Sequence, residues 1–255
     1  MKHWKENILA PLAFTAALIL LWELACVLFS LPATVLPTPS AVAKALVQYW
    51  PAIRDNSLQT LMTTLLGFGL AIVFGLVLGV AIGWSKLIYG ALYPVMIAFN
   101  AVPKVAVVPI LIIWFGIGTI PAILTAFLIS FFPIVVNVAT GLATTEPELQ
   151  DVLRALGASK LDVVRKVGIP RSMPYFFGSL KVAITLAFVG SVVSETIGAN
   201  SGLGKMMLDA QAGFNVELVF AGVAALAVLG IALYAITALV ERRFTGWAFR
   251  AEGIG

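Results

Sequence analysis

Few side chains in this sequence could carry out covalent or metal chemistry. The chain has one histidine, His3, and one cysteine, Cys26, which lies inside an apolar stretch. A histidine-based triad or a metal cluster needs more such residues, and no carboxylate pair at helical spacing lies within an apolar stretch. The segment ANSGLGKM (199–206) comes nearest to a phosphate-binding loop, but it lacks the first glycine and has Met206 after the lysine. We therefore expect no catalytic residue, no metal site and no ATP hydrolysis by this chain.

Four ionisable residues lie inside long apolar stretches: Glu23, Lys104, Lys181 and Glu195. If these stretches cross a membrane, each charge is costly and should face a solute path or pair with another polar group. Lys104 lies at a proline break, and Glu195 comes just before the polar, glycine-rich segment GANSGLG. The candidate path residues are therefore Pro103, Lys104, Glu195, Asn200 and Ser201. A structural pairing or an interfacial position is the alternative for Lys104 and Glu195. Glu23 and Lys181 are weaker candidates, and Lys181 can extend to the nearer membrane surface.

The composition predicts that these stretches do cross a membrane. Of 255 residues, 61% are hydrophobic and 11% are charged, whereas about a quarter of a soluble domain is charged. The apolar stretches are continuous rather than alternating, which favours helices over a barrel. Because about 20 residues cross the hydrocarbon layer, we expect one all-α integral membrane domain over residues 1–255, with a core at about 59–240. The six expected spans are 8–29, 59–83, 87–115, 119–142, 175–194 and 217–240.

The distribution of lysine and arginine predicts the orientation of these spans. With a cytoplasmic N-terminus, eleven of these residues lie on the inner side and three, Lys44, Arg54 and Lys205, on the outer side. Such an excess is typical of cytoplasmic loops, and it explains the net charge of +4 better than a nucleic-acid partner does. The first span is longer than the apolar region of a signal peptide, so it should remain as an anchor. We expect a multi-pass membrane protein with both termini in the cytoplasm.

Glycines and prolines suggest how the spans pack. The second span has glycine at every fourth position, at Gly75, Gly79 and Gly83, which would let another helix approach closely. The third span is cut by Pro103 and Pro109, so a kinked helix and a re-entrant one both remain open.

Two segments between spans have their own signals. The outer segment LPTPSAVAKALVQYWPAIRDN is expected to be an interfacial helix that Ser40 caps and Pro51 limits. The segment GANSGLG is expected to form a tight turn at the outer mouth.

The segment LRALGASKLDVVRKVGIPRSMP (153–174) is charged although apolar stretches flank it. A first short helix is predicted by the capping-box spacing of Thr145 and Glu148 and by an apolar stripe at 149, 152, 153 and 156, with Gly157 at its end. Ser159 and Asp162 repeat the capping-box spacing at the start of a second helix, which Gly168 and Pro170 should end. The pair could lie on the lipid surface or fit a groove on a soluble partner. Two capped helices at a set angle favour the partner slightly.

This segment resembles the cytoplasmic loop of binding-protein-dependent ABC transporter permeases. Their pattern is Glu-Ala-Ala, three residues, glycine, nine residues and Ile-x-Leu-Pro. The matching positions here are Gly157, Val167, Ile169 and Pro170, whereas DVL (151–153) stands in place of Glu-Ala-Ala. LPTPSAV, VPKVAVVPILIIWFGIG and SETIGANSGLG resemble permeases of the nitrate, sulfonate and taurine type. The resemblance thus covers nearly the whole chain.

The resemblance implies one subunit of an importer in the cell (inner) membrane. Two copies of the chain would form the path in membrane lipid, and two cytoplasmic ATPase subunits would use ATP. A periplasmic or lipid-anchored solute-binding protein would deliver a small anionic solute. Segment 145–170 would be the coupling helix, which passes ATPase closure to the path as a rigid-body change. The residues expected to dock on the ATPase are Asp151, Arg154, Leu156, Gly157, Ala158, Ser159, Leu161, Asp162 and Pro170. The alternative is an ATP-independent secondary transporter or channel, which would need no neighbouring ATPase gene.

Overall fold

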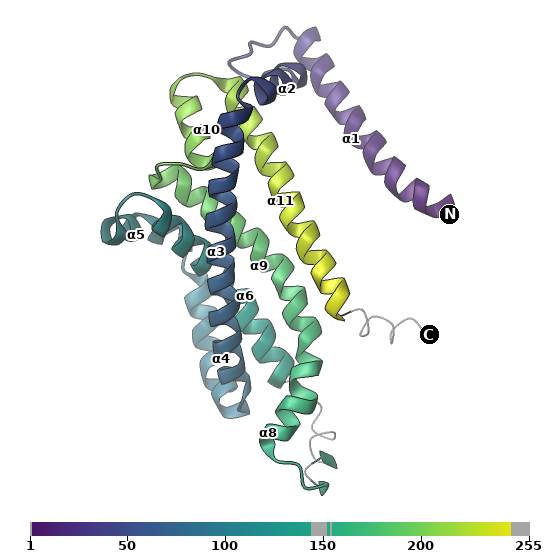
Figure 1. The fold of residues 1–255 in the computed structure, drawn as a ribbon, viewed down its shortest axis with the longest axis vertical. Helices are drawn as coiled ribbons and strands as arrows, with labels where there is room; N and C mark the ends of the chain where they lie inside the picture. Colours follow the sequence, from purple (N-terminus) through teal and green to yellow (C-terminus); the bar gives the residue numbers. More distant parts are fainter. Residues whose placement is uncertain (1, 144–151, 154, 246–255) are drawn as a thin grey trace.

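A computed structural model describes residues 2–143, 152–153 and 155–245, which form helices and connecting turns with no strand among them (Figure 1). The long helices are α1 (Lys2–Leu28), α3 (Trp50–Gly83), α6 (Thr119–Ala143), α9 (Ile169–Gly198) and α11 (Val216–Thr245). The shorter ones are α2 (Pro39–Gln48), α4 (Lys86–Ala101), η1 (Lys104–Val107), α5 (Val108–Phe115), α8 (Lys160–Val163), η2 (Val164–Gly168) and α10 (Leu203–Ala212). We call the end with α2 and α10 the upper end and the end with α8 the lower end.

The expected all-α membrane fold is confirmed. Within the described part of the chain, five helices are long and apolar enough to cross a membrane, and the bent pair of α4 with η1 and α5 makes a sixth candidate. The two halves of that pair meet at 72°, so the third span is sharply broken rather than continuous. Pro103 explains the break, because it has no N–H to donate and holds the preceding Val102 in an extended conformation; Pro109 lies in the first turn of α5, where its missing N–H costs little.

The centre of the bundle is α3 packed on α6 through a line of glycines. A Cβ on Gly75 or Gly79 would lie 2.7 Å from Cβ of Ile134 or Val138, and one on Gly83 would lie 2.8 Å from Cβ of Leu142. These glycines are therefore needed for the two backbones to approach so closely. Lipid provides no hydrophobic force between helices, so this dense contact is what holds them together. The packing role predicted for the glycines is confirmed.

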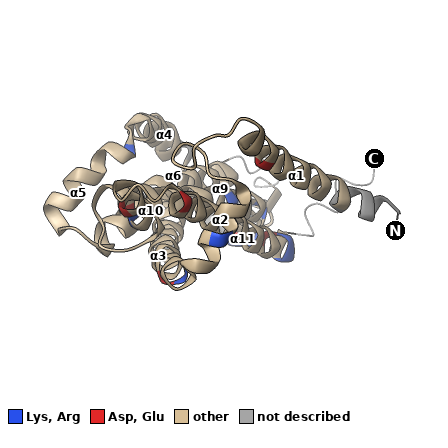
Figure 2. Ribbon diagram, turned by 90° about the horizontal axis from the view of Figure 1, so that it is seen from above, with Lys and Arg blue, Asp and Glu red and all other residues tan. Residues whose placement is uncertain are grey.

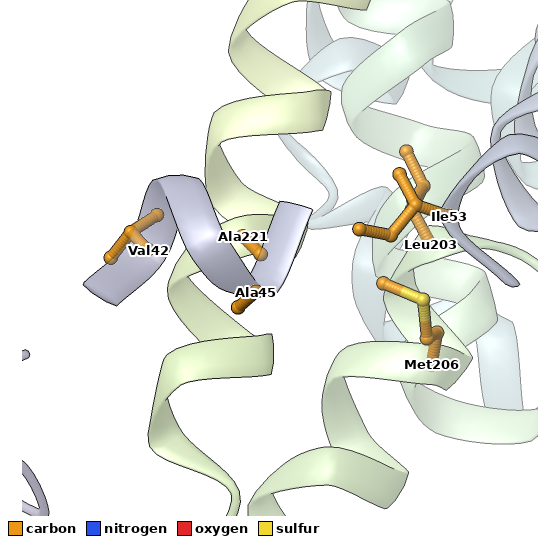
Figure 3. Packing of buried hydrophobic residues seen from close by; sticks show 6 residues of the cluster. All are labelled: Val42, Ala45, Ile53, Leu203, Met206 and Ala221. Carbon is orange, nitrogen blue, oxygen red and sulfur yellow. The ribbon is translucent and has the colours of Figure 1, made fainter. Parts of the chain in front are cut away.

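At the upper end, two short helices build a small apolar cluster on the long ones (Figure 3). It joins α2, α3, α10 and α11 through Val42, Ala45, Ile53, Leu203, Met206 and Ala221. Helix α3 has 34 residues and is about 51 Å long, roughly 20 Å more than the hydrocarbon layer. The cluster lies at the upper end of α3, where the helix is longer than the hydrocarbon layer requires.

Helix α1 stands apart from the rest of the bundle, as Figures 1 and 2 both show. Its upper half meets the bundle where the ring of Trp22 lies 5.9 Å from that of Phe220 in α11.

Three details of the helix boundaries differ from the expectations. Helix α2 is capped by Thr38, whose hydroxyl accepts from the Ala41 N–H, and not by Ser40. Pro51 lies in the first turn of α3, where its missing N–H costs little, rather than at the end of α2. The segment GANSGLG forms the expected turn but leads directly into α10, which the sequence analysis did not predict.

The predicted stop at Gly168 and Pro170 is wrong. Helix α8 runs through the π-helical turn η2 into α9, so Pro170 lies in the first turn of a long helix. The wider π turn lets the chain pass Pro170, whose ring and missing N–H do not fit an ordinary α turn.

Candidate functional site

Glu195 is buried at the upper end of α9, with 1% of its surface exposed. One carboxylate oxygen, Oε2, accepts hydrogen bonds from the Thr60 hydroxyl at 2.9 Å and from the Gly204 N–H at 3.0 Å. The other, Oε1, lies 3.5 Å from the hydroxyls of Thr63 and Ser191. A carboxylate is tolerated in such a place only when its oxygens are hydrogen-bonded in this way.

The first turn of α10 is held by side chains of other helices. Three successive backbone N–H groups donate to α3 or α9: Gly202 to Asn56 (2.8 Å), Leu203 to Thr60 (2.9 Å) and Gly204 to Glu195 (3.0 Å). A helix leaves these N–H groups without internal partners, and its N-terminus favours a negative charge. Gly202 has φ +115°, and a Cβ there would overlap the Glu195 carboxylate. The turn therefore needs both the acid on α9 and the glycine beside it.

Three of the five candidate path residues lie together. Glu195, Asn200 and Ser201 line one small cavity at the upper ends of α3, α6 and α9, together with Gln59 and Thr119. The cavity holds about 30 Å³, which is enough for a water molecule and far below the ~300–1,000 Å³ of typical ligand pockets. In this conformation it is a small polar space.

The other two candidates, Pro103 and Lys104, lie at the break between α4 and η1. The Lys104 ammonium donates to the backbone carbonyl of Asn100 at 2.9 Å and to its side-chain oxygen at 2.7 Å. The last carbonyls of a helix lack internal partners and favour a cation. Lys104 is half-buried and Pro103 is exposed. The ammonium thus caps α4 and stays at the edge of the bent span.

Glu23 and Lys181 each have a partner on another helix. The Glu23 carboxylate accepts from the Ser40 N–H at 3.0 Å and from its hydroxyl at 2.8 Å, at the start of α2. Lys181 forms an ion pair of 2.6 Å with Glu241 of α11. Glu241 was not predicted as a partner, because a sequence alone does not say which helices are neighbours.

At the lower end, the start of α8 is held by hydrogen bonds within its own turn. The Ser159 hydroxyl donates to the Asp162 carboxylate at 2.6 Å, and the Asp162 N–H donates to the Ser159 hydroxyl at 3.2 Å. Gly157 has φ +84°, and the Ala158 N–H donates to the carbonyl of Leu153 at 3.0 Å, as in a glycine-terminated helix end. The second predicted capping box and the predicted helix end at Gly157 are confirmed.

The lower turn, the name we give to residues 152–153 and 155–163, exposes apolar side chains beside polar ones. Val152, Leu156 and Leu161 are 56%, 79% and 61% exposed. Gly157 and Ser159 are also exposed, whereas Ala158, Asp162 and Pro170 are half-buried. Asp151, Arg154 and the first capping box, Thr145 with Glu148, lie outside the described residues.

Asn56 and Thr60 were missed as site residues although the sequence carries a signal for them. They lie four residues apart on α3, so they share one face, and Thr63 lies on the same face. A polar face at the end of an apolar span indicates a polar neighbour. What could not be read from the sequence is that this neighbour is the first turn of α10.

Comparison with known proteins identifies the family of this chain. A family model described as "binding-protein-dependent transport system inner membrane component" matches residues 71–246. Two inward-facing structures of the MetNI methionine ABC transporter share the fold, with TM-scores of 0.66 and 0.68 at 19% and 20% identity; each alignment covers 78% of this chain and 98% of the other.

Curated relatives are similar over most of their length. A probable ABC transporter permease protein of Haemophilus influenzae is 31% identical over 90% of this chain and 94% of its own. A formylaminopyrimidine transport permease of Halalkalibacterium halodurans is 30% identical over 94% and 96%, respectively. A riboflavin transport system permease of Chloroflexus aurantiacus is 34% identical over 90% and 87%.

Proposed function

Because the chain belongs to the family of binding-protein-dependent transport system inner membrane components, we propose that it is the path-forming subunit of an ABC importer for a small anionic solute. Members of this family are transport permeases rather than enzymes. In the proposed importer, two copies of the chain form the path, separate ATPase subunits hydrolyse ATP, and a solute-binding protein delivers the solute.

The observation that carries the proposal is the lower turn. It combines a fixed backbone shape with exposed Leu156 and Leu161. An exposed apolar patch with a defined shape suits a groove on another protein. We assign this turn to the ATPase subunit, with Leu156 and Leu161 as its apolar contacts and the Ser159–Asp162 pair holding their geometry. The direct connection of α8 to α9 through η2 supports mechanical coupling, because a push on the turn acts on a continuous helix.

This assignment sets the orientation of the chain. The lower turn, the loop before α4 and the lower end of α11 face the cytoplasm, and both termini lie on that side. The upper end, with α2 and α10, then faces the outside. Arg242 and Arg243 in the last turn of α11 support this orientation, since basic residues concentrate on the cytoplasmic side.

Lys104 is the side chain that favours an anion as the solute. Its ammonium is half-buried at the broken span and already faces oxygen atoms of Asn100. Relatives include permeases named for aliphatic sulfonates in Bacillus subtilis and for taurine in Escherichia coli. Both solutes carry a sulfonate, and we propose a solute of this kind.

Reconstitution tests the proposal. The chain is placed in proteoliposomes with its ATPase subunit, and the solute-binding protein is added with nitrate, taurine or an alkyl sulfonate. We expect ATP hydrolysis and uptake to rise together when the binding protein carries its solute. Uptake that proceeds without ATP and without the ATPase subunit would instead support a secondary transporter or channel.

A further inference from the structure

The turn between α10 and α11 places an aromatic ring at a backbone position that favours glycine. Phe214 has φ +55°. Its N–H donates to the Gln211 carbonyl at 3.0 Å, and the N–H of Asn215 donates to the Ala210 carbonyl at 2.8 Å. This pair of bonds defines a helix end in which the left-handed residue is usually glycine. A bulky side chain in that conformation is unfavourable and needs an explanation.

Comparable helix ends elsewhere in the chain use small residues. Ser30, with φ +46°, follows α1, and Gly157, with φ +84°, lies in the lower turn. Ser30 and Phe214 are the non-glycine residues with positive φ in the described part of the chain. Of the residues at these three helix ends, Phe214 alone has a large side chain.

The ring does not contribute to the fold that holds it. The side chain of Phe214 is 83% exposed. The turn is fixed by its neighbour Asn215, whose side chain accepts from the Leu218 N–H and donates to the Tyr49 hydroxyl, both at 3.1 Å. The protein thus keeps an unfavourable backbone conformation and an exposed aromatic surface at one residue. Strained residues of this kind cluster at functional sites.

Phe214 lies at the edge of an apolar hollow on the upper end. The hollow has a volume of about 460 Å³ and is lined by Leu208, Gln211, Ala212, Phe214, Val216 and Val219. The exposed carboxylates of Asp209 and Glu217 lie beside these residues in the sequence, and Asp209 forms an ion pair with Lys205. The turn lies at the top of the molecule near α2 (Figure 1). Helix α11 is about 45 Å long and therefore exceeds a hydrocarbon layer of ~30 Å.

We propose that Phe214 and this hollow form a docking site for the solute-binding protein; this inference rests on the proposed function. Three observations favour a soluble protein as the occupant. The turn lies at the upper end of α11, a helix longer than the hydrocarbon layer is thick, which favours a position in water rather than among acyl chains. Asp209 is already paired with Lys205, and the exposed carboxylate of Glu217 repels anionic lipid headgroups and suits a basic residue on a partner. The family itself is described as binding-protein-dependent. An exposed aromatic ring beside a hollow is also the usual form of an interface anchor.

The substitution Phe214→Gly separates docking from folding. Glycine adopts the left-handed conformation without cost, so the variant should unfold at the same temperature as wild type or a higher one. In proteoliposomes holding the complete transporter, we expect basal ATP hydrolysis to be unchanged. The concentration of solute-binding protein that gives half-maximal stimulation should rise at least tenfold. The matched control is Phe29→Ala, which removes a ring that is 75% exposed at the end of α1 and should leave the stimulation curve in place.

An unchanged stimulation curve for Phe214→Gly would overturn the inference while leaving the proposed function intact. A wild-type transporter that shows no stimulation by its binding protein would instead refute the proposed function, and the docking site with it.

A photo-crosslinker identifies the occupant directly. Benzoylphenylalanine is placed at position 214 of the full transporter in lipid nanodiscs, and the purified solute-binding protein is added before illumination. We expect a crosslink to that protein. Crosslinks only to lipid or only to a second copy of this chain would contradict the proposal.

Discussion

Two helix starts at opposite ends of this molecule use similar capping chemistry with partners from different places. At the start of α10, the N–H groups of Gly202, Leu203 and Gly204 are taken by side chains on α3 and α9. At the start of α8, Ser159 and Asp162 cap each other within one turn.

The difference decides what each segment can do. Capping from other helices fixes α10 to the bundle, so the upper end behaves as one packed unit. Local capping gives the lower turn its shape without attaching its exposed side chains to the bundle, so Leu156 and Leu161 remain available to a partner. A substitution at the start of α10 should therefore lower the free energy of unfolding, whereas one at the start of α8 should weaken binding of the partner.

The largest expected effect comes from Glu195→Ala. It leaves the Gly204 N–H and the Thr60 hydroxyl without their acceptor in a buried place, so we expect the free energy of unfolding to fall by about 3 kcal/mol. Glu195→Gln keeps the shape and one acceptor, and should cost about 1 kcal/mol. Unfolding of the purified protein in mixed micelles measures both. A stable Glu195→Gln variant that has lost uptake would show that the carboxylate also serves the path.

Gly202→Ala, at the start of α10, should lower the free energy of unfolding by about 2 kcal/mol. The φ of +115° at this position disfavours any side chain, and the new Cβ would meet the Glu195 carboxylate. The control is Gly213→Ala at the other end of α10. Gly213 has φ −85°, and a Cβ there would come no closer than 3.5 Å to its nearest neighbour. If Gly202→Ala melted at the wild-type temperature, as its control should, the long-range capping of α10 would not be important for stability.

Gly157→Val tests the lower start. A Cβ there meets nothing within 4 Å, so its cost is the backbone strain of about 1–2 kcal/mol in a local turn. We expect the permease to reach the membrane and to melt nearly as wild type does, while co-purification with the ATPase and uptake fall together. Gly90→Val, in open space on α4, is the control. Normal co-purification of Gly157→Val with the ATPase would contradict the assignment of the lower turn to that subunit.

Lys104→Met should have the smallest effect on stability, about 0.5 kcal/mol, because it removes only a cation from the end of α4. If the ammonium attracts the solute, uptake should fall about tenfold while assembly and basal ATP hydrolysis persist. A larger loss of thermal stability with proportionate loss of uptake would make Lys104 a purely structural cap. Wild-type uptake and stability together would exclude both roles.

The parts of the fold that could be predicted from the sequence are those that depend on neighbours along the chain. Hydropathy predicted the long spans, the four-residue repeat predicted the glycine contact of α3, and local spacing predicted the Ser159–Asp162 capping box. Glu195 was recognised as unusual, but its partners come from residues about 135 positions away on α3 and from α10. Helix α10 was missed because its first turn is stabilised by those distant side chains. The ion pair of Lys181 with Glu241 was missed for the same reason.

The most direct test of the account is a crosslink from the lower turn. A single cysteine is placed at Leu156 in a Cys26→Ser background, because Leu156 is 79% exposed and Cys26 is the one native cysteine. The assembled transporter in proteoliposomes is then treated with a short bifunctional thiol reagent that also reacts with amines. We predict a crosslinked product containing this chain and the ATPase subunit, absent when the cysteine is moved to Val47 at the upper end. Attachment only to amine-bearing lipid would contradict the account, because the turn would then lie on the membrane surface.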